Sequence, residues 1–189
     1  MRKSYDFFSF FLIPALTFCL AAGNSLTGTN FSVIGNREGH RALFLLWGAV
    51  SGIYFYLYGR ELMEYGECED RTGRACLFLS LVLFLCGIGL PYLPGKVPVL
   101  SRLHVWASFG GPFCLFFFLY RFLLLLERKQ GIRMAGQKLF QLSTAAVSAF
   151  LYLRIGIVSS LLEMFVTLST CVYLAVLQGR LEKIRLSNH

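Results

Sequence analysis

Charged residues are scarce in this chain. Only 15% of its 189 residues are Asp, Glu, Lys or Arg, and 56% are hydrophobic. Soluble domains usually carry about 25% charged residues, and the mean hydropathy here is +0.62. This composition excludes an ordinary soluble domain and indicates a membrane protein.

The short motifs of common enzyme and metal sites are also missing. The sequence contains no P-loop, no Gly-x-Ser-x-Gly and no His-Glu-x-x-His pattern. Its six cysteines show no Cys-x-x-Cys spacing, and its three histidines (His40, His104 and His189) lie far apart. We therefore predict neither a cofactor nor a resident metal.

Apolar stretches separated by short charged breaks run along the whole chain. Six of them approach the length of about 20 residues that crosses a bilayer as a helix: 7–23, 42–59, 76–93, 103–126, 139–153 and 157–178. The last two are separated by Arg154 and Gly156, which we interpret as a tight turn. The sequence thus predicts an all-α, polytopic membrane helix bundle with six transmembrane helices, forming one integral membrane domain over residues 1–189.

Positive charges are distributed unevenly between the two sides of this bundle. Of the 18 Lys and Arg residues, 13 lie in the two tails and in the breaks on the same side. Because such residues stay cytoplasmic, both termini are predicted to be cytoplasmic, in a multi-pass protein of the plasma membrane. The same positions account for the net charge of +8 without a nucleic-acid partner. An alternative for the first stretch is a signal peptide cleaved after the small residues at 21–23, which leaves the mature N-terminus outside.

Polar residues on the opposite, outer side are the candidate functional residues: Asn36, Arg37, His40, Arg41, His104, Arg154 and Glu163. Glu163 lies inside the last span, where a carboxylate costs roughly 2.5–3.5 kcal/mol unless it is paired or faces water. It is either a functional group or half of a structural ion pair with Arg154. His104 is otherwise an interfacial helix start, and the arginines are otherwise a solvated loop against lipid headgroups.

Three other features have structural interpretations. Gly48 and Gly52 form a Gly-x-x-x-Gly pattern that serves either packing inside the bundle or homodimerisation. Trp47 and Trp106, near the outer ends of their spans, are expected in an aromatic belt. Arg121, near the cytoplasmic end of the fourth span, is expected to extend to the interface.

Three local patterns resemble the DRAM/FRAG-type six-helix membrane proteins and their bacterial relatives of unknown function. They are Ser32-Val33-Ile34-Gly35 followed by Phe44, His104-Val105-Trp106-Ala107-Ser108, and Ser160-Leu161-Leu162-Glu163. The likeness departs at Met164, where that family often has Trp, and in the run 36–41. The resemblance implies a six-helix bundle with cytoplasmic termini and a link to membrane-lipid handling, without a settled reaction.

From these residues we expect a non-enzymatic membrane protein whose outer polar cluster recognises a lipid headgroup or a partner membrane protein, as a monomer or homo-oligomer. The arginines would contact phosphate, and His104 and Glu163 would orient the pocket. One alternative is a small transporter or channel with Glu163 as a proton or cation site, although the two halves show no inverted repeat. Another is a lipid hydrolase with His40 or His104 as base or metal ligand.

Overall fold

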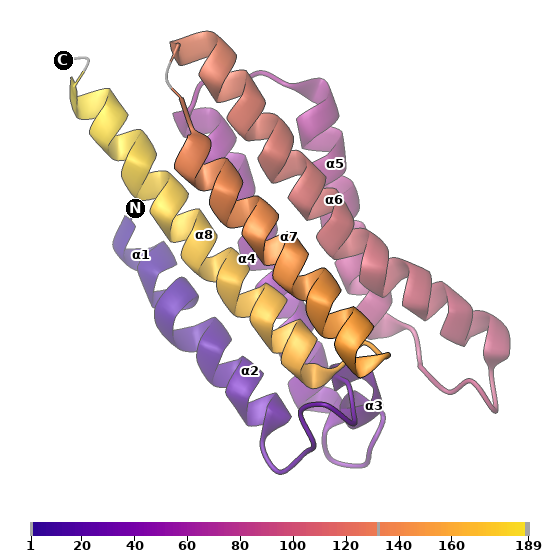
Figure 1. Ribbon diagram of the computed structural model, residues 1–189. Helices are drawn as coiled ribbons and strands as arrows, with labels where there is room; N and C mark the ends of the chain where they lie inside the picture. Colours follow the sequence, from indigo (N-terminus) through magenta and orange to yellow (C-terminus); the bar gives the residue numbers. More distant parts are fainter. Residues whose placement is uncertain (1, 132, 188–189) are drawn as a thin grey trace.

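The long helices of the chain run alternately up and down a single bundle. A computed structural model describes residues 2–131 and 133–187, in which the elements follow in this order: α1 (Arg2–Phe7), η1 (Phe8–Leu12), α2 (Ile13–Ala21), α3 (Phe31–Gly35), α4 (Arg41–Tyr65), α5 (Arg71–Gly89), α6 (Pro98–Gln130), α7 (Ala135–Ile155) and α8 (Ser160–Ser187). Figure 1 shows both chain ends at the same end of the bundle. We call this the inner end and the opposite one the outer end. The predicted all-α class is confirmed for the described residues.

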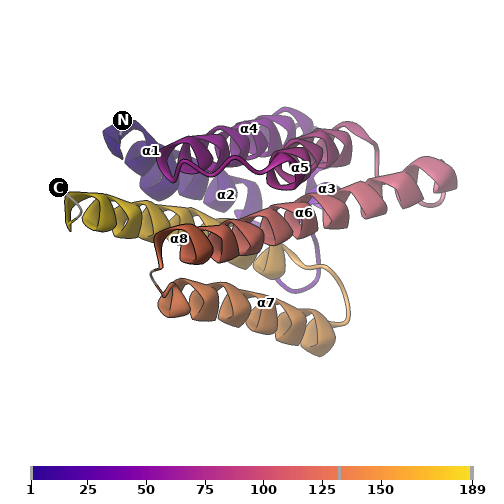
Figure 2. The same ribbon diagram turned by 90° about the horizontal axis from the view of Figure 1, so that it is seen from above.

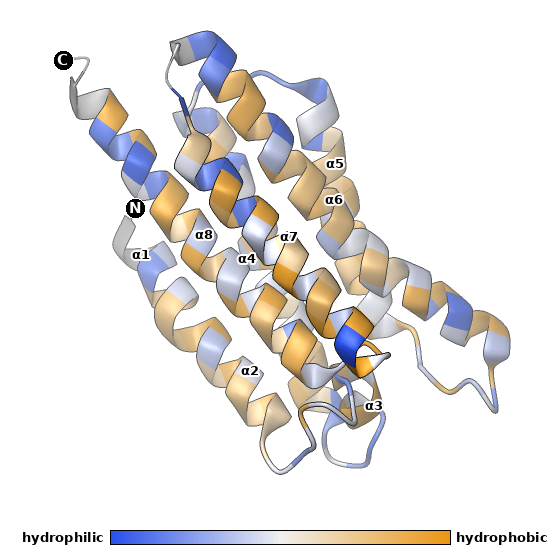
Figure 3. Cartoon of the chain, in the orientation of Figure 1, coloured by the Kyte–Doolittle hydropathy of each residue, from blue (hydrophilic) through white to orange (hydrophobic). Residues whose placement is uncertain are grey.

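Four of these helices are long and apolar enough to cross a membrane: Arg41–Tyr65, Arg71–Gly89, Pro98–Lys129 and Ser160–Ile184. Tyr5–Ala21 is a shorter apolar helix. In Figure 3 the middles of the helices are largely apolar, and polar residues gather toward the inner end. The chain therefore has the build of an integral membrane protein.

The first helical segment contains a wide turn for a reason visible in its sequence. Pro14 has no N–H to give to the carbonyl four residues earlier, and its ring clashes with that carbonyl. The π-helix η1 ends two residues before Pro14, and the N–H of Ile13 bonds to the carbonyl of Phe8, five residues back. The wider turn lets the helix continue past the proline instead of ending there.

Glycines bring α4 and α5 close together. A Cβ added to Gly48 would lie 2.3 Å from Cγ2 of Ile88, and one added to Gly52 would lie 3.3 Å from Cβ of Phe84. Both neighbours belong to α5. The Gly-x-x-x-Gly pattern of α4 therefore serves packing within the bundle.

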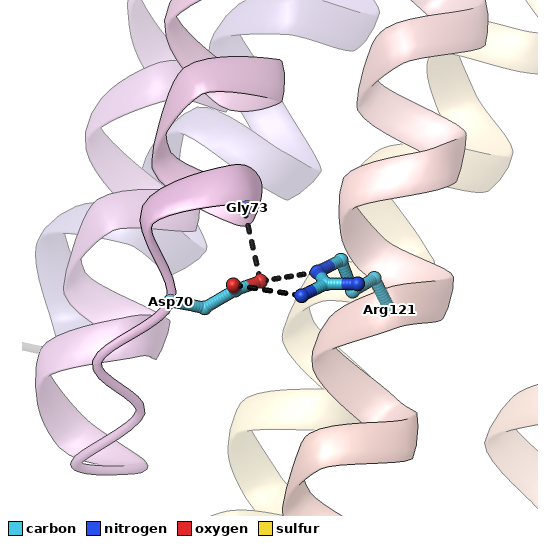
Figure 4. A network of polar contacts seen from close by, with 3 residues as sticks. All are labelled: Asp70, Gly73 and Arg121. Carbon is cyan, nitrogen blue, oxygen red and sulfur yellow. Dashed lines mark hydrogen bonds and ion pairs between the residues drawn. The ribbon is translucent and has the colours of Figure 1, made fainter.

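An ion pair joins the start of α5 to α6 near the inner end (Figure 4). Oδ2 of Asp70 caps α5 by accepting from the N–H of Gly73 at 2.9 Å, and Arg121 donates Nε to Oδ2 at 2.5 Å and Nη2 to Oδ1 at 3.0 Å. The guanidinium of Arg121 lowers the pKa of Asp70 below its ordinary value. Arg121 thus has a protein partner, which corrects the expectation that it merely extends to the interface.

The short helix α3 closes the outer end of the bundle. Asn30 caps it, with Oδ1 accepting from the N–H of Val33 at 2.8 Å. Phe31 and Ile34 have no exposed surface, and burying each stabilises the fold by about 1.5–3 kcal/mol. Because the side chains of Phe31 and Ile34 are both fixed in the core, the position of Ser32 between them is fixed as well.

Trp47 belongs to this outer core and not to an aromatic belt. Its ring meets Phe31 edge to face at 4.9 Å, and its Nε1 donates to Oγ1 of Thr17 at 2.9 Å. Only 8% of Trp47 is exposed, against 77% of Trp106. The expectation of an interfacial position was wrong for Trp47, because an indole N–H with a buried acceptor has no need of the headgroup region.

Candidate functional site: a cavity between α6, α7 and α8

A large cavity lies where α7 stands apart from the rest of the bundle. In Figure 2 α7 forms a separate layer, with α6 and α8 between it and the pair α4 and α5. The space bounded by these helices measures about 1130 Å³, above the range of about 300–1,000 Å³ that is usual for small-ligand pockets. On α6 its lining extends from His104 to Leu119, a distance of about 22 Å at 1.5 Å per residue.

Helix α7 turns its small and polar side chains toward this cavity. The lining residues repeat at helical spacing along one face: Gln141, Thr144, Ala145, Ser148, Ala149 and Tyr152. Large apolar residues on other faces are exposed, namely Leu139, Leu142, Phe150 and Leu153. The helix is therefore built with one face for the cavity and the remainder for an apolar surrounding such as lipid.

The inner end of the cavity is closed by hydrogen bonds around Gln141. Its Nε2 donates to the carbonyl of Phe116 on α6 at 2.7 Å, and its Oε1 accepts from the hydroxyl of Tyr173 on α8 at 3.4 Å. Gln141 is only 4% exposed. Buried amide groups in proteins keep their hydrogen bonds. The two bonds of Gln141 therefore fix the spacing of α6, α7 and α8.

Polar groups converge at the outer end of the cavity. They come from the segment that leads into α3, from α6 and from α8: Thr29, Asn30, Ser32, His104, Ser108 and Glu163. Between this end and Gln141 the walls are mainly aromatic and aliphatic. The cavity thus matches an amphiphilic ligand, because a long apolar part leads to polar side chains at one end.

His104 and Ser32 form a hydrogen-bonded pair within this polar end. Nδ1 of His104 lies 3.1 Å from the carbonyl oxygen of Leu90, and Nε2 lies 2.8 Å from Oγ of Ser32. His104 is 3% exposed and Ser32 7%. His104 was predicted as an outer-side candidate, and its alternative as a simple interfacial helix start does not fit this burial.

Glu163 lies in the first turn of α8 and holds the start of α3. Its Oε2 accepts from the backbone N–H of Phe31 at 2.6 Å. Within the described residues no ion pair joins it to Arg154, so the structural pair considered from the sequence is corrected to this backbone contact. Nearby, the N–H of Ser160 bonds to the carbonyl of Thr29 at 2.7 Å, which fixes α8 against the same segment.

The remaining candidates lie outside the cavity lining. Nδ2 of Asn36 donates to the carbonyls of Ser32 and Tyr92 at 2.9 and 3.0 Å, which braces α3 against the segment before α6. Arg37 donates to Asn24 at 2.6 Å, and Nη2 of Arg41 donates to the carbonyl of Gly89 at 3.0 Å.

His40 and Arg154 complete the set. Nδ1 of His40 lies 3.3 Å from the carbonyl oxygen of Glu38, and Arg154 is exposed at the end of α7. The structure therefore places His104 and Glu163 in the lining of one cavity, of which the three arginines are not part. Among the described residues no group of three or more His, Cys, Asp or Glu is placed to hold a metal ion.

Several residues of the site were not selected as candidates from the sequence. Gln141 sits in the apolar stretch 139–153, where only its polarity distinguishes it. Asn30 had a recognisable signal, because Asn is a favoured helix cap. The helix that it caps, α3, was not expected from the sequence.

Comparison with known proteins adds no relationship. No protein family, no curated protein and no solved structure matches this chain. The interpretation of the site therefore depends on its own geometry.

Proposed function

We propose that this chain is a six-span protein of the plasma membrane, with both termini cytoplasmic, that binds one lipid in the cavity between α6, α7 and α8. The acyl chain occupies the apolar length, and the head lies among Ser32, His104 and Glu163. The observation that carries the proposal is the shape of the cavity, which extends about 22 Å along α6 from a polar outer end into a mainly apolar length.

The two remaining spans of this proposal are the segment α1–η1–α2 and α7. Helix α7 has 21 residues, about 31 Å at 1.5 Å per residue, against a hydrocarbon thickness of about 30 Å. Helix α7 is not among the four helices that are apolar enough by composition to cross a membrane. Part of the reason is its cavity face, which carries the polar residues Gln141, Thr144 and Ser148. The hydroxyls of Thr144 and Ser148 donate to carbonyls one turn back in α7, and Gln141 bonds to α6 and α8, so these polar groups are satisfied within the protein and α7 is compatible with a membrane position.

The composition of the polar end favours a particular kind of head. It offers hydroxyl, imidazole and carboxylate groups, while Arg37, Arg41 and Arg154 lie outside the lining. Glu163 lines the cavity and uses Oε2 to accept from Phe31; no other hydrogen bond to its carboxyl group is found among the described residues, so Oε1 is available to a polar head. A head with hydroxyl or amine donors is therefore favoured over one recognised through its phosphate.

Filling the cavity tests this proposal. In Ala145→Phe the new ring enters the cavity, whereas in Ala146→Phe, the neighbouring exposed position on α7, it points away. Native mass spectrometry of the detergent-purified proteins should find one retained lipid in the wild type and in Ala146→Phe, and its loss in Ala145→Phe. Equal lipid retention in both variants would refute a lipid inside the cavity.

A further inference from the structure

The contact between Ser32 and His104 has the polarity of a nucleophile and its base. The carbonyl of Leu90 can only accept, so Nδ1 of His104 carries the ring proton at 3.1 Å from it. In a neutral imidazole this leaves Nε2 unprotonated. The hydroxyl of Ser32 therefore donates to Nε2 across 2.8 Å, the distance at which a base removes a proton.

The surroundings hold this pair in its geometry. Ser32 is fixed because its neighbour Phe31 is fully buried and its own carbonyl accepts from Asn36. The ring of His104 is held by its contact with the carbonyl of Leu90, and the centroid of the Tyr92 ring lies 5.4 Å from that of the imidazole. Orientation of the base by a third group is the arrangement expected of an activated serine, with a backbone carbonyl here in the place of a carboxylate.

The position of the pair selects the class of substrate. Ser32 and His104 line the polar outer end of the cavity, directly beyond its apolar length. In an acyl-ester lipid the ester carbonyl occupies the corresponding place, between chain and head. A lipid bound with its chain along α6 and α7 thus presents the ester to Oγ of Ser32.

We propose that Ser32 and His104 form a catalytic dyad that hydrolyses an acyl ester of the bound lipid. Oγ of Ser32 attacks the ester carbonyl while its proton passes to Nε2 of His104. The lipid alcohol then leaves with that proton, and the acyl group stays on Ser32. Water, deprotonated by Nε2, attacks the acyl-serine; a fatty acid is released and the proton returns to Oγ. This activity depends on the lipid occupancy proposed above.

Asn30 is placed to stabilise the charge that develops on the carbonyl oxygen. It lies two residues before Ser32 and lines the same cavity, and its Oδ1 is already engaged in capping α3. Its Nδ2 donates to no other group in the part of the chain that the structure describes, so it is available to a substrate oxygen. Side-chain amides serve in this role in other acyl-transfer sites.

A fluorophosphonate with a long alkyl chain tests the dyad on the purified, lipid-retaining protein. Attack by Oγ of Ser32 on phosphorus expels fluoride and leaves a stable adduct, which peptide mass spectrometry locates on the residue. We expect the wild type to be labelled at Ser32. Labelling should be absent in Ser32→Ala and fall by about 100-fold or more in His104→Gln.

Two further variants separate activation from folding. Ser143→Ala removes an exposed hydroxyl of α7 that lies outside the cavity lining, and it should be labelled like the wild type. Asn30→Asp keeps the helix cap and removes the Nδ2 donor, which should slow labelling about 100-fold. Native mass spectrometry of each variant reports whether lipid is still bound.

The outcomes distinguish the two proposals. Lipid-retaining wild-type protein without an adduct on Ser32 overturns the dyad and leaves lipid binding standing. Labelling that persists in Ser32→Ala also overturns it. A wild type that retains no lipid contradicts the proposed function itself, whatever the labelling shows.

Discussion

At the scale of single residues, side chains that look alike in the sequence differ sharply in their surroundings. Arg121 and Arg60 both lie near the inner ends of long helices. Arg121 binds the carboxylate of Asp70, which is 9% exposed, whereas Arg60 pairs with Glu64 where both side chains are more than 60% exposed. Exposed pairs contribute little because water competes for both charges. Only the first pair is expected to matter for stability.

Replacing Asp70 by Asn isolates this ion pair. The amide oxygen of Asn still accepts from the N–H of Gly73, so the cap on α5 is retained while the charge is lost. We expect thermal unfolding in detergent, followed by tryptophan fluorescence, to show a Tm lowered by about 2–6 °C at pH 7. Glu64→Gln is the control and should leave Tm unchanged.

The effect of Asp70→Asn should also depend on pH. Arg121 lowers the pKa of Asp70 in the folded protein, so the stabilisation is complete above the ordinary carboxyl pKa of about 4 and is lost as the pH falls through the folded value. The difference in Tm between the variant and the wild type should therefore stay constant from pH 7 to about 5 and shrink below about 4. A difference that grows in acid contradicts this assignment.

Two substitutions at Glu163 distinguish its role in stability from its role in lipid binding. Glu163→Gln keeps an oxygen for the N–H of Phe31, whereas Glu163→Ala leaves this buried donor unpaired at a cost of about 1–3 kcal/mol. We expect the Gln variant to unfold at the wild-type Tm but to retain less lipid, because an amide NH2 replaces the carboxyl oxygen that is available to the head. Full lipid retention in a stable Gln variant would confine Glu163 to holding α3.

At the scale of helices, the sequence predicted where long helices occur, but it predicted less well where they end and which helices pack together. The turn at Arg154 and Gly156 is confirmed: α7 ends at Ile155, and Gly156 takes a φ of +81° that suits glycine. Helix α3 was missed because its five residues lie in a polar segment with no helical periodicity, and α3 is stabilised by long-range burial of Phe31. Hydropathy is averaged over a span and does not show which face of α7 lines a cavity.

The same limit applies to the candidate site. Residue type and outer-side position selected His104 and Glu163, both of which line the cavity. They equally selected Arg37 and Arg41, which bind Asn24 and Gly89 instead. Which polar residues converge depends on how each helix is rotated about its axis. In this chain both the lipid-facing and the buried faces are apolar, so the sequence does not reveal that rotation.

Packing between α4 and α5 gives a prediction at this scale. A methyl group at Gly48 overlaps Ile88, whereas one at Gly179 in α8 meets no atom within 4 Å. Gly48→Ala should therefore destabilise the protein by about 1–3 kcal/mol, and Gly179→Ala should be neutral or stabilising by up to about 1 kcal/mol. Unfolding in detergent measures both. If Gly48→Ala instead kept its stability and altered only the oligomeric state, the pattern would serve a homodimer.

At the scale of the whole molecule, charge and connectivity agree on one orientation. The tails and the connections α4–α5 and α6–α7 meet at the inner end (Figure 1), and 13 of the 18 basic residues lie in these parts or in the helix segments next to them. From the positive-inside rule we propose that this end lies in the cytoplasm, with the polar end of the cavity toward the outer leaflet.

Accessible cysteines test this orientation. In a chain whose six native cysteines are replaced by alanine, Lys96→Cys lies in the exposed connection at the outer end and Glu69→Cys in the exposed connection at the inner end. A membrane-impermeant maleimide added to intact cells should label only the cysteine at 96, and both after lysis. Labelling at 69 in intact cells would reverse the orientation.

The proposed lipid site requires that an acyl chain lies inside the bundle. A phosphatidylethanolamine with a diazirine in its acyl chain, incorporated in nanodiscs with the wild-type protein, inserts on illumination into whatever the chain touches. We expect mass spectrometry to locate adducts on the cavity faces, at residues such as Thr144, Ser148 and Val166. Adducts confined to outward-facing residues such as Phe78, Phe150 and Leu153 would contradict a lipid-binding cavity.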